Sequence, residues 1–314
     1  MDERDDLSRV LSGLVGLARR KQVQYDSVDA WWPAFRAARR EWLQPIDQAL
    51  IGGVTADRAG YAFAAGYQAA LRSLDSGLPE DRICCLSVTE EGGGHPRAVK
   101  ATFTPIAGTR AYSLSGRKKW ATLSSAGGVA LAVASMGTDA EGRNQLRVAR
   151  VDLGSPGVKV VPMPPTSFIP EIQHCRLEFD DVRVEADQFL DGDGYTRYVR
   201  PFRTVEDTHV GAGIMGYLLN VAFRHEWPRD IREGLLHLIV GLRALAMADP
   251  SAPATHIALE GLFHARDDVM KRIEPLWQTA ATDERERWQR DAGIAAIAGN
   301  VRARRTEAAW ERLG

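Results

Sequence analysis

The chain has 314 residues, of which 45% are hydrophobic and 26% charged, as is ordinary for a globular protein of two or three domains. Its formal net charge of −1 provides no basic field for nucleic acid, so we expect no nucleic-acid partner. The sequence has no signal-like apolar region near its start, no run long enough to span a bilayer and only three cysteines, which indicates a reduced, cytoplasmic protein without a membrane partner.

The first part of the chain, residues 1–82, has the pattern of an N-terminal helical domain. Apolar residues recur at helical spacing from Leu7 to Leu17, and residues 56–74 combine alanines with aromatic side chains, as in a buried helix. Glycine, proline and charged residues then end the helical pattern.

The middle part, residues 83–193, changes to the pattern of strands. Short apolar runs, among them 83–88, 118–123 and 145–152, alternate with turns rich in glycine, proline and threonine. Many short strands with closely spaced turns predict a central antiparallel β-barrel or sandwich.

The last part, residues 194–314, returns to helical spacing and predicts a C-terminal α-helical bundle, so the whole chain is expected to have an α+β fold. The helix expected at 232–248 carries apolar residues on more than one face, which indicates an interface between subunits. These residues are Leu235, Leu236, Leu238, Ile239, Leu242 and Leu245.

Two motifs in the β-region have residue types that suit a flavin. Thr89-Glu-Glu-Gly-Gly-Gly-His95 offers a hydroxyl and glycines that allow close approach of the backbone to a ligand. In Trp120-Ala-Thr122, strand alternation places an indole and a hydroxyl on one face. A flavin ring needs an apolar platform and hydrogen-bonding groups along its polar edge. Each motif also has an ordinary interpretation, as a flexible turn or as strand residues at the border of a core.

The order and spacing of these motifs resemble the acyl-CoA dehydrogenase family, from about residue 83 to 216. In that family a Thr-Glu-Pro-x-x-Gly-Ser block binds FAD through its Thr and backbone and meets the acyl-CoA through its Ser. Thr89, Glu90 and Gly94 match this block, whereas Glu91 replaces the Pro and His95 replaces the Ser.

Two further blocks extend the resemblance. The family's Trp-Ile-Thr/Ser block, which packs against the flavin, corresponds to Trp120-Ala-Thr122, and its Leu-x-Phe-Asp-x-Val-x-Val strand corresponds to residues 177–184. The resemblance implies substrate contacts at Gly94 and His95. It implies FAD contacts at Leu86, Val88, Thr89, Trp120, Ala121 and Thr122.

The resemblance also implies a reaction, the α,β-dehydrogenation of an acyl thioester or similar acyl compound by an FAD-dependent oxidoreductase. Most members take the catalytic base from a Glu-Gly-Thr-like loop near the C-terminus, and we expect this sequence to end at Gly314 before the position of that loop. Others carry it as Glu-Arg on the first bundle helix, which places the candidate base at Glu206, with Asp207 in place of the Arg. The ordinary alternative for Glu206 is a carboxylate on a helix surface.

The resemblance implies a homodimer or homotetramer, but one cofactor element differs. An Arg-x-x-x-Phe-Gly element of the family reaches across the dimer to the FAD pyrophosphate, and residues 225–230 replace it here. FAD is therefore expected to bind weakly, to bind with help from a different subunit in a heteromer, or to be lost. Two alternatives to the dehydrogenase follow: a flavin monooxygenase of the same fold, or a non-catalytic, partner-dependent subunit.

Two other patterns are interpreted as structural. Gly211-Ala-Gly-Ile-Met-Gly216 matches a dinucleotide-binding motif, but a polar, helix-like segment precedes it instead of a buried strand, so we interpret it as close helix packing. The seven histidines show no metal-ligand spacing, and we expect no metal site.

Overall fold

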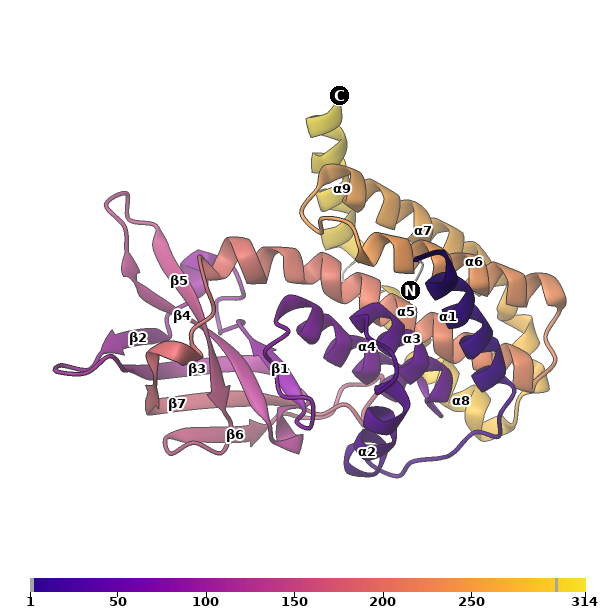
Figure 1. Cartoon of the computed structure of the whole chain (residues 1–314), viewed down its shortest axis with the longest axis horizontal. Coiled ribbons are helices and arrows are strands. Elements are labelled where there is room, and N and C mark those ends of the chain that lie inside the picture. Colours follow the sequence, from indigo (N-terminus) through magenta and orange to yellow (C-terminus); the bar gives the residue numbers. More distant parts are fainter. Residues whose placement is uncertain (1–2, 297–298) are drawn as a thin grey trace. The chain divides into compact units, whose positions relative to one another are not determined.

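The computed structural model describes residues 3–296 and 299–314, and its elements fall into two compact units (Figure 1). The helical unit extends to Ser73 and resumes at Thr204, with residues 167–169 added from the middle of the chain. The β-unit contains residues 74–166 and 170–203. Met1 and Asp2 of the expected N-terminal domain, and residues 297–298 of the expected bundle, lie outside the described residues.

Local sequence signals explain the helix boundaries. The Ser27 hydroxyl accepts a hydrogen bond from the Ala30 amide and so caps α2, and Pro45 opens α3 at a position where its missing N–H costs nothing. The N-terminal helices are α1 (Glu3–Ala18), α2 (Val28–Arg39), α3 (Pro45–Thr55) and α4 (Ala59–Leu74). The C-terminal helices are α5 (Arg200–Arg224), α6 (Arg229–Ala246), α7 (Pro253–Ile273), α8 (Thr282–Asp291) and α9 (Gly299–Leu313).

Glycines allow α5 to pack closely against α3 and α4. A Cβ on Gly213 would lie 2.4 Å from the Ala62 carbonyl oxygen, and one on Gly53 would lie 1.9 Å from the Gly213 oxygen. A Cβ on Gly216 would lie 2.5 Å from the Leu50 oxygen. Only glycine permits such backbone contact, and the interpretation of Gly211–Gly216 as helix packing is confirmed.

The β-unit is a single mixed sheet. Its hydrogen-bonded order is β1-β4-β2-β3-β7-β6, and β5 pairs with β4. The strands are β1 (Cys84–Ser87), β2 (Thr102–Pro105), β3 (Tyr112–Thr122), β4 (Val129–Thr138), β5 (Asn144–Asp152), β6 (Val158–Pro162) and β7 (His174–Val184).

The expectation of a purely antiparallel sheet is wrong in one respect, because β1 and β2 pair with β4 in parallel. The chain passes through the β2–β3 hairpin before it returns as β4, which therefore runs in the same direction as β1. Residues 129–135 of β4 are all buried, and residues 129–134 form an unbroken apolar run in the sequence, as is typical of strands with parallel partners.

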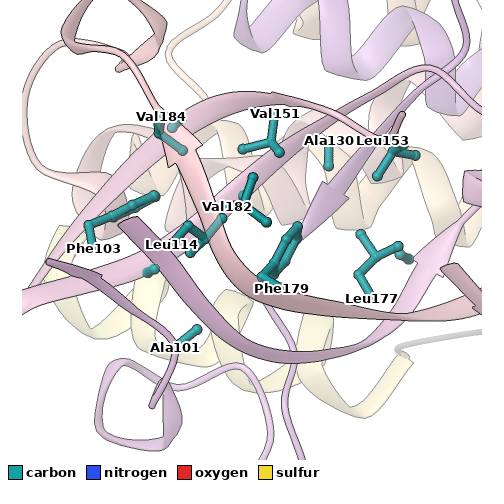
Figure 2. Packing of buried hydrophobic residues seen from close by; sticks show 14 of the residues in the cluster. Ala101, Phe103, Leu114, Ala130, Val151, Leu153, Leu177, Phe179, Val182 and Val184 are labelled. Atoms are coloured by element: carbon teal, nitrogen blue, oxygen red, sulfur yellow. The ribbon is translucent and has the colours of Figure 1, made fainter. Parts of the chain in front are cut away.

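The core of the β-unit is formed by alternating side chains of the sheet. Figure 2 shows Phe103, Leu114 and Phe179 pointing toward one another from β2, β3 and β7, with smaller residues around them. Ala130 of β4 belongs to the same core. This packing holds β3 and β7, the two strands that carry the candidate site, in a fixed register.

Candidate functional site

The end of β3 carries Trp120, Ala121 and Thr122 in an irregular backbone. The β3–β7 register shifts between Lys118 and Ala121, and Trp120 has a left-handed φ of 59°, which is rare for a bulky residue. The bulge turns the indole outward, so that Trp120 is 49% exposed while Ala121 and Thr122 are buried. An exposed indole held in an unusual backbone conformation is a feature of binding sites more than of cores.

The imidazole of His174 joins the two motif side chains. His174 is the register partner of Thr122 on β7, and its Nδ1 lies 3.2 Å from the Thr122 Oγ1. Its ring also meets that of Trp120 edge to face, with centroids 5.6 Å apart and planes at 74°. Sequence reasoning missed His174, because only the β3–β7 register, with its bulge, brings this residue to the motif.

The environment of His174 controls its charge. Burial of the ring lowers the pKa of His174 below its ordinary value of about 6.5. The imidazole is therefore neutral near pH 7, with a proton on one ring nitrogen and a lone pair on the other.

The Thr89 block lies directly beside this end of β3. Leu86 and Val88 are buried at the end of β1, and the Thr89 carbonyl oxygen accepts a 2.7 Å hydrogen bond from the Lys119 amide, one residue before Trp120. Glu90 forms a buried ion pair with Lys118 at 2.7 Å, and Lys118 also donates to the Val88 carbonyl. The β-unit thus brings both motifs together.

Gly94 and His95 complete the turn that follows. A Cβ placed on Gly94 would lie 3.6 Å from the Thr89 hydroxyl oxygen, so Gly94 borders Thr89. His95 is exposed, and its Nδ1 accepts a hydrogen bond from the Arg97 amide, which begins the short 3-10 helix Pro96–Ala98. The structure gives His95 this local capping role; its substrate contact stays a prediction.

Glu206 belongs to α5 in the helical unit, whereas the other predicted site residues belong to the β-unit. Its side chain is half-buried. Asp207 stands where the family's Glu-Arg motif has its Arg. It forms ion pairs with Arg302 at 3.5 Å and Arg305 at 3.0 Å on α9. Asp207 therefore contributes to packing between helices.

The helical unit also contains a cavity of about 760 Å³ whose walls come from α7, α8, α9 and the segments beside them. Phe263, Trp277 and Trp288 supply apolar surface, and charged side chains such as Arg302 border it. None of the predicted site residues lines this cavity.

Within residues 3–296 and 299–314, no group of three or more His, Cys, Asp or Glu side chains is arranged to hold a metal ion. Among the helices that the structure describes, none has the length and apolarity needed to cross a membrane.

The β-unit matches a known family model. Residues 85–182 match the acyl-CoA dehydrogenase middle domain. Solved structures extend the likeness to the whole chain: butyryl-CoA dehydrogenase from Megasphaera elsdenii has a TM-score of 0.72 at 14% identity, over 99% of both chains. The chain has the acyl-CoA dehydrogenase fold.

Other proteins of this fold are similar to the same extent. The prolyl acyl carrier protein oxidase AnaB has a TM-score of 0.69 at 14% identity, over 100% of both chains. PigA, in a structure with FAD and proline, has a TM-score of 0.68 at 14% identity and covers 100% of this chain and 99% of its own. No curated protein sequence matches the chain significantly. The resemblance to the acyl-CoA dehydrogenase family and the predicted fold class are confirmed.

The residues at the end of β3 suit the flavin that PigA binds in this fold. Trp120 offers an exposed aromatic face, while Thr122 and His174 offer a hydroxyl and an imidazole at one edge of the indole. This is the combination of apolar platform and polar edge that an isoalloxazine ring requires.

Proposed function

We propose that the chain is an FAD-dependent oxidoreductase that removes one hydrogen from each of the α and β carbons of an acyl thioester. One observation carries the proposal: Trp120, half exposed in a left-handed backbone, stands beside the Thr122–His174 pair at the end of β3. FAD would supply an acceptor for the hydride that leaves the β carbon.

The residues of the β-unit have distinct roles in this proposal. Trp120 forms the platform for the ring, Thr122 the hydrogen bond at its edge, and Ala121 and Thr89 backbone or hydroxyl contacts. Leu86 and Val88 support this surface from β1. Gly94 and His95, in the turn beside Thr89, would border the acyl group.

Glu206 is the proposed general base. Its carboxylate would take the α proton as the bond between that proton and carbon breaks, while the β hydrogen leaves with its electron pair. Glu206 is half-buried on α5, and a carboxylate is one of the side chains that can act as a general base.

Two proteins with a similar fold support the proposed substrate class. AnaB is an oxidase of a prolyl group on an acyl carrier protein, and the butyryl-CoA enzyme is a dehydrogenase. We therefore propose an acyl thioester, carried either by coenzyme A or by a carrier protein, as the partner molecule of this chain.

A homodimer or homotetramer is proposed for the assembly. Leu235, Leu238, Ile239 and Leu242 of α6 are buried within the chain itself, so they need no partner to cover them. Exposed apolar side chains that a partner would cover are found instead at Met247, Trp310 and Leu313. Light scattering of dilute protein tests this assembly; a 34.5 kDa particle would contradict it.

A second candidate, a partner-dependent subunit, has one specific observation in its favour. Glu284 accepts hydrogen bonds from both Arg224 and His225 inside the helical unit. Arg224 and His225 lie at the end of α5, where the resemblance to the family places a contact with the FAD pyrophosphate. Both side chains bind Glu284 instead. A heteromeric subunit of the same fold would then have to supply that contact.

The absorption spectrum of the purified protein, with and without added FAD, tests the proposal. We expect a bound flavin that is bleached anaerobically by an acyl thioester. Trp120→Ala should lose most of the flavin, whereas Leu43→Ala, at another exposed large hydrophobic residue, should retain it. A colourless protein that takes up no FAD would favour the partner-dependent subunit, and a flavin that no thioester bleaches would favour the monooxygenase.

A further inference from the structure

The side chain of His174 contacts both the hydroxyl of Thr122 and the indole of Trp120. Its Nδ1 lies 3.2 Å from the Thr122 hydroxyl oxygen, and its ring packs edge to face against the Trp120 indole. A change in this imidazole therefore acts on both groups at once.

The backbone fixes His174 from both sides. Its carbonyl oxygen accepts a 2.9 Å hydrogen bond from the Met163 amide, and the preceding Gln173 carbonyl accepts a 2.8 Å hydrogen bond from the Leu123 amide. These bonds tie the start of β7 to the residue that follows Thr122. The backbone of His174 is thereby held opposite Thr122.

The position of a single proton decides what the Thr122 hydroxyl can do. If Nδ1 carries the ring proton, it donates to Oγ1, and the hydroxyl hydrogen of Thr122 is free for a second acceptor. If Nδ1 has the lone pair, it accepts that hydrogen, and Oγ1 can only accept from elsewhere. Since burial keeps the ring neutral, both arrangements are open to it at neutral pH.

We propose that His174 is a positioning residue, which sets the hydrogen-bonding direction of the Thr122 hydroxyl toward a flavin bound against Trp120. The proposal rests on the proposed function. A neutral imidazole that can present Nδ1 either as donor or as acceptor lets Thr122 serve as a donor toward one redox form of the cofactor and as an acceptor toward the other. The ring stays neutral through this change, because it loses the proton on one nitrogen and takes up another on the second nitrogen by exchange with solvent or a neighbouring group.

The test compares the midpoint potential of bound FAD in four proteins. His174→Phe keeps a ring against Trp120 but removes Nδ1, and Thr122→Val removes the hydroxyl with little change in volume. We expect both variants to bind FAD and to shift its potential by about 30 mV, which corresponds to a tenfold change in the relative binding of the two redox forms. The double variant should show the same shift as either single variant, because the imidazole acts through the hydroxyl.

Two controls separate this role from a merely structural one. His174→Asn places an amide near the position of Nδ1 and should return the potential toward the wild-type value. His237→Phe, at an exposed histidine on α6, should leave it unchanged. An unaltered potential in His174→Phe, or additive shifts in the double variant, would overturn the proposal.

The outcome also distinguishes this inference from the proposed function. If the wild-type protein binds no FAD, both fail together. If it binds FAD, and loses it on Trp120→Ala, but His174→Phe has the wild-type potential, only the role of His174 is rejected. If His174→Phe does not fold, His174→Leu, which also removes Nδ1, takes its place in the comparison with Thr122→Val and the double variant.

Discussion

Lys118 and Glu90 form an ion pair that is almost completely removed from water. Nζ and Oε1 are 2.7 Å apart, and the two side chains are 0% and 8% exposed. Glu90 also accepts hydrogen bonds from the Lys100 and Ala101 amides. The pKa of Lys118 is lowered, because the effect of burial exceeds the opposing effects of the hydrogen bond and the charge of Glu90. Glu90 belongs to the Thr89–His95 motif and Lys118 lies on β3 two residues before Trp120, so the pair fixes the turn after β1 to β3.

Removal of one partner should destabilise the β-unit strongly. Glu90→Gln leaves a buried ammonium group without its counter-charge, and we expect a loss of about 3 kcal/mol in the free energy of unfolding, measured with urea. Lys118→Met should cost less, because the Glu90 carboxylate keeps its two backbone donors. The neighbouring pair Lys119–Glu91 is the matched control: Glu91 is 81% exposed, so Glu91→Gln should cost under about 1 kcal/mol. Equal losses at Glu90 and Glu91 would contradict the argument.

The fold was predictable from local patterns, and its exceptions have physical causes. Helical spacing of apolar residues and short strands between turns gave the α+β architecture. The parallel pairing of β1 with β4 depends on contacts far apart in sequence, between Cys84 and Val129 for example, and no local pattern specifies it. The unbroken apolar run at residues 129–134 was the available signal in the sequence, since an antiparallel strand with one exposed face would alternate apolar and polar residues.

Close helix packing predicts the effect of Gly213→Ala. The added methyl group would meet the Ala62 carbonyl oxygen at 2.4 Å, so α4 and α5 must separate. We expect the free energy of unfolding, measured with urea or by thermal unfolding, to fall by about 1–3 kcal/mol, the usual range for overpacking. Gly261→Ala in α7 is the control, because its Cβ would meet nothing within 4 Å, and alanine there should stabilise the helix by up to about 1 kcal/mol. A neutral Gly213→Ala would show that the contact is easily relieved.

His209 predicts a dependence of stability on pH. It is 2% exposed in α5, and burial lowers its pKa to about 4, against about 6.5 in an unfolded chain. Between these values the unfolded chain binds more protons, so stability is complete above pH 6.5 and is lost as pH falls toward 4. The loss attributable to His209 should reach about 3 kcal/mol. His209→Gln should show a smaller decrease between pH 7 and pH 4 than the wild type, and parallel pH profiles would exclude this role.

The candidate site was only partly predictable. The motifs identified Thr89, Trp120 and Thr122, and the structure brings their segments side by side through the Thr89–Lys119 hydrogen bond. Strand alternation could not foresee that a bulge turns Trp120 outward with a left-handed φ. It also could not identify His174, whose contact with Thr122 depends on the β3–β7 register.

Glu206→Gln separates cofactor binding from chemistry. The amide has almost the shape of the carboxylate but cannot accept the α proton, so we expect unchanged FAD content and at least a hundredfold slower anaerobic bleaching by an acyl thioester, in line with the usual contribution of a general base (~10²–10⁴-fold). Glu233→Gln on α6 is the control, since Glu233 is 58% exposed and pairs only with Arg229 among the contacts that the structure defines for it. It should retain the wild-type rate. Bleaching of Glu206→Gln at the wild-type rate would assign Glu206 to the helix surface and place the base elsewhere; loss of FAD in this variant would instead indicate a structural role for the carboxylate.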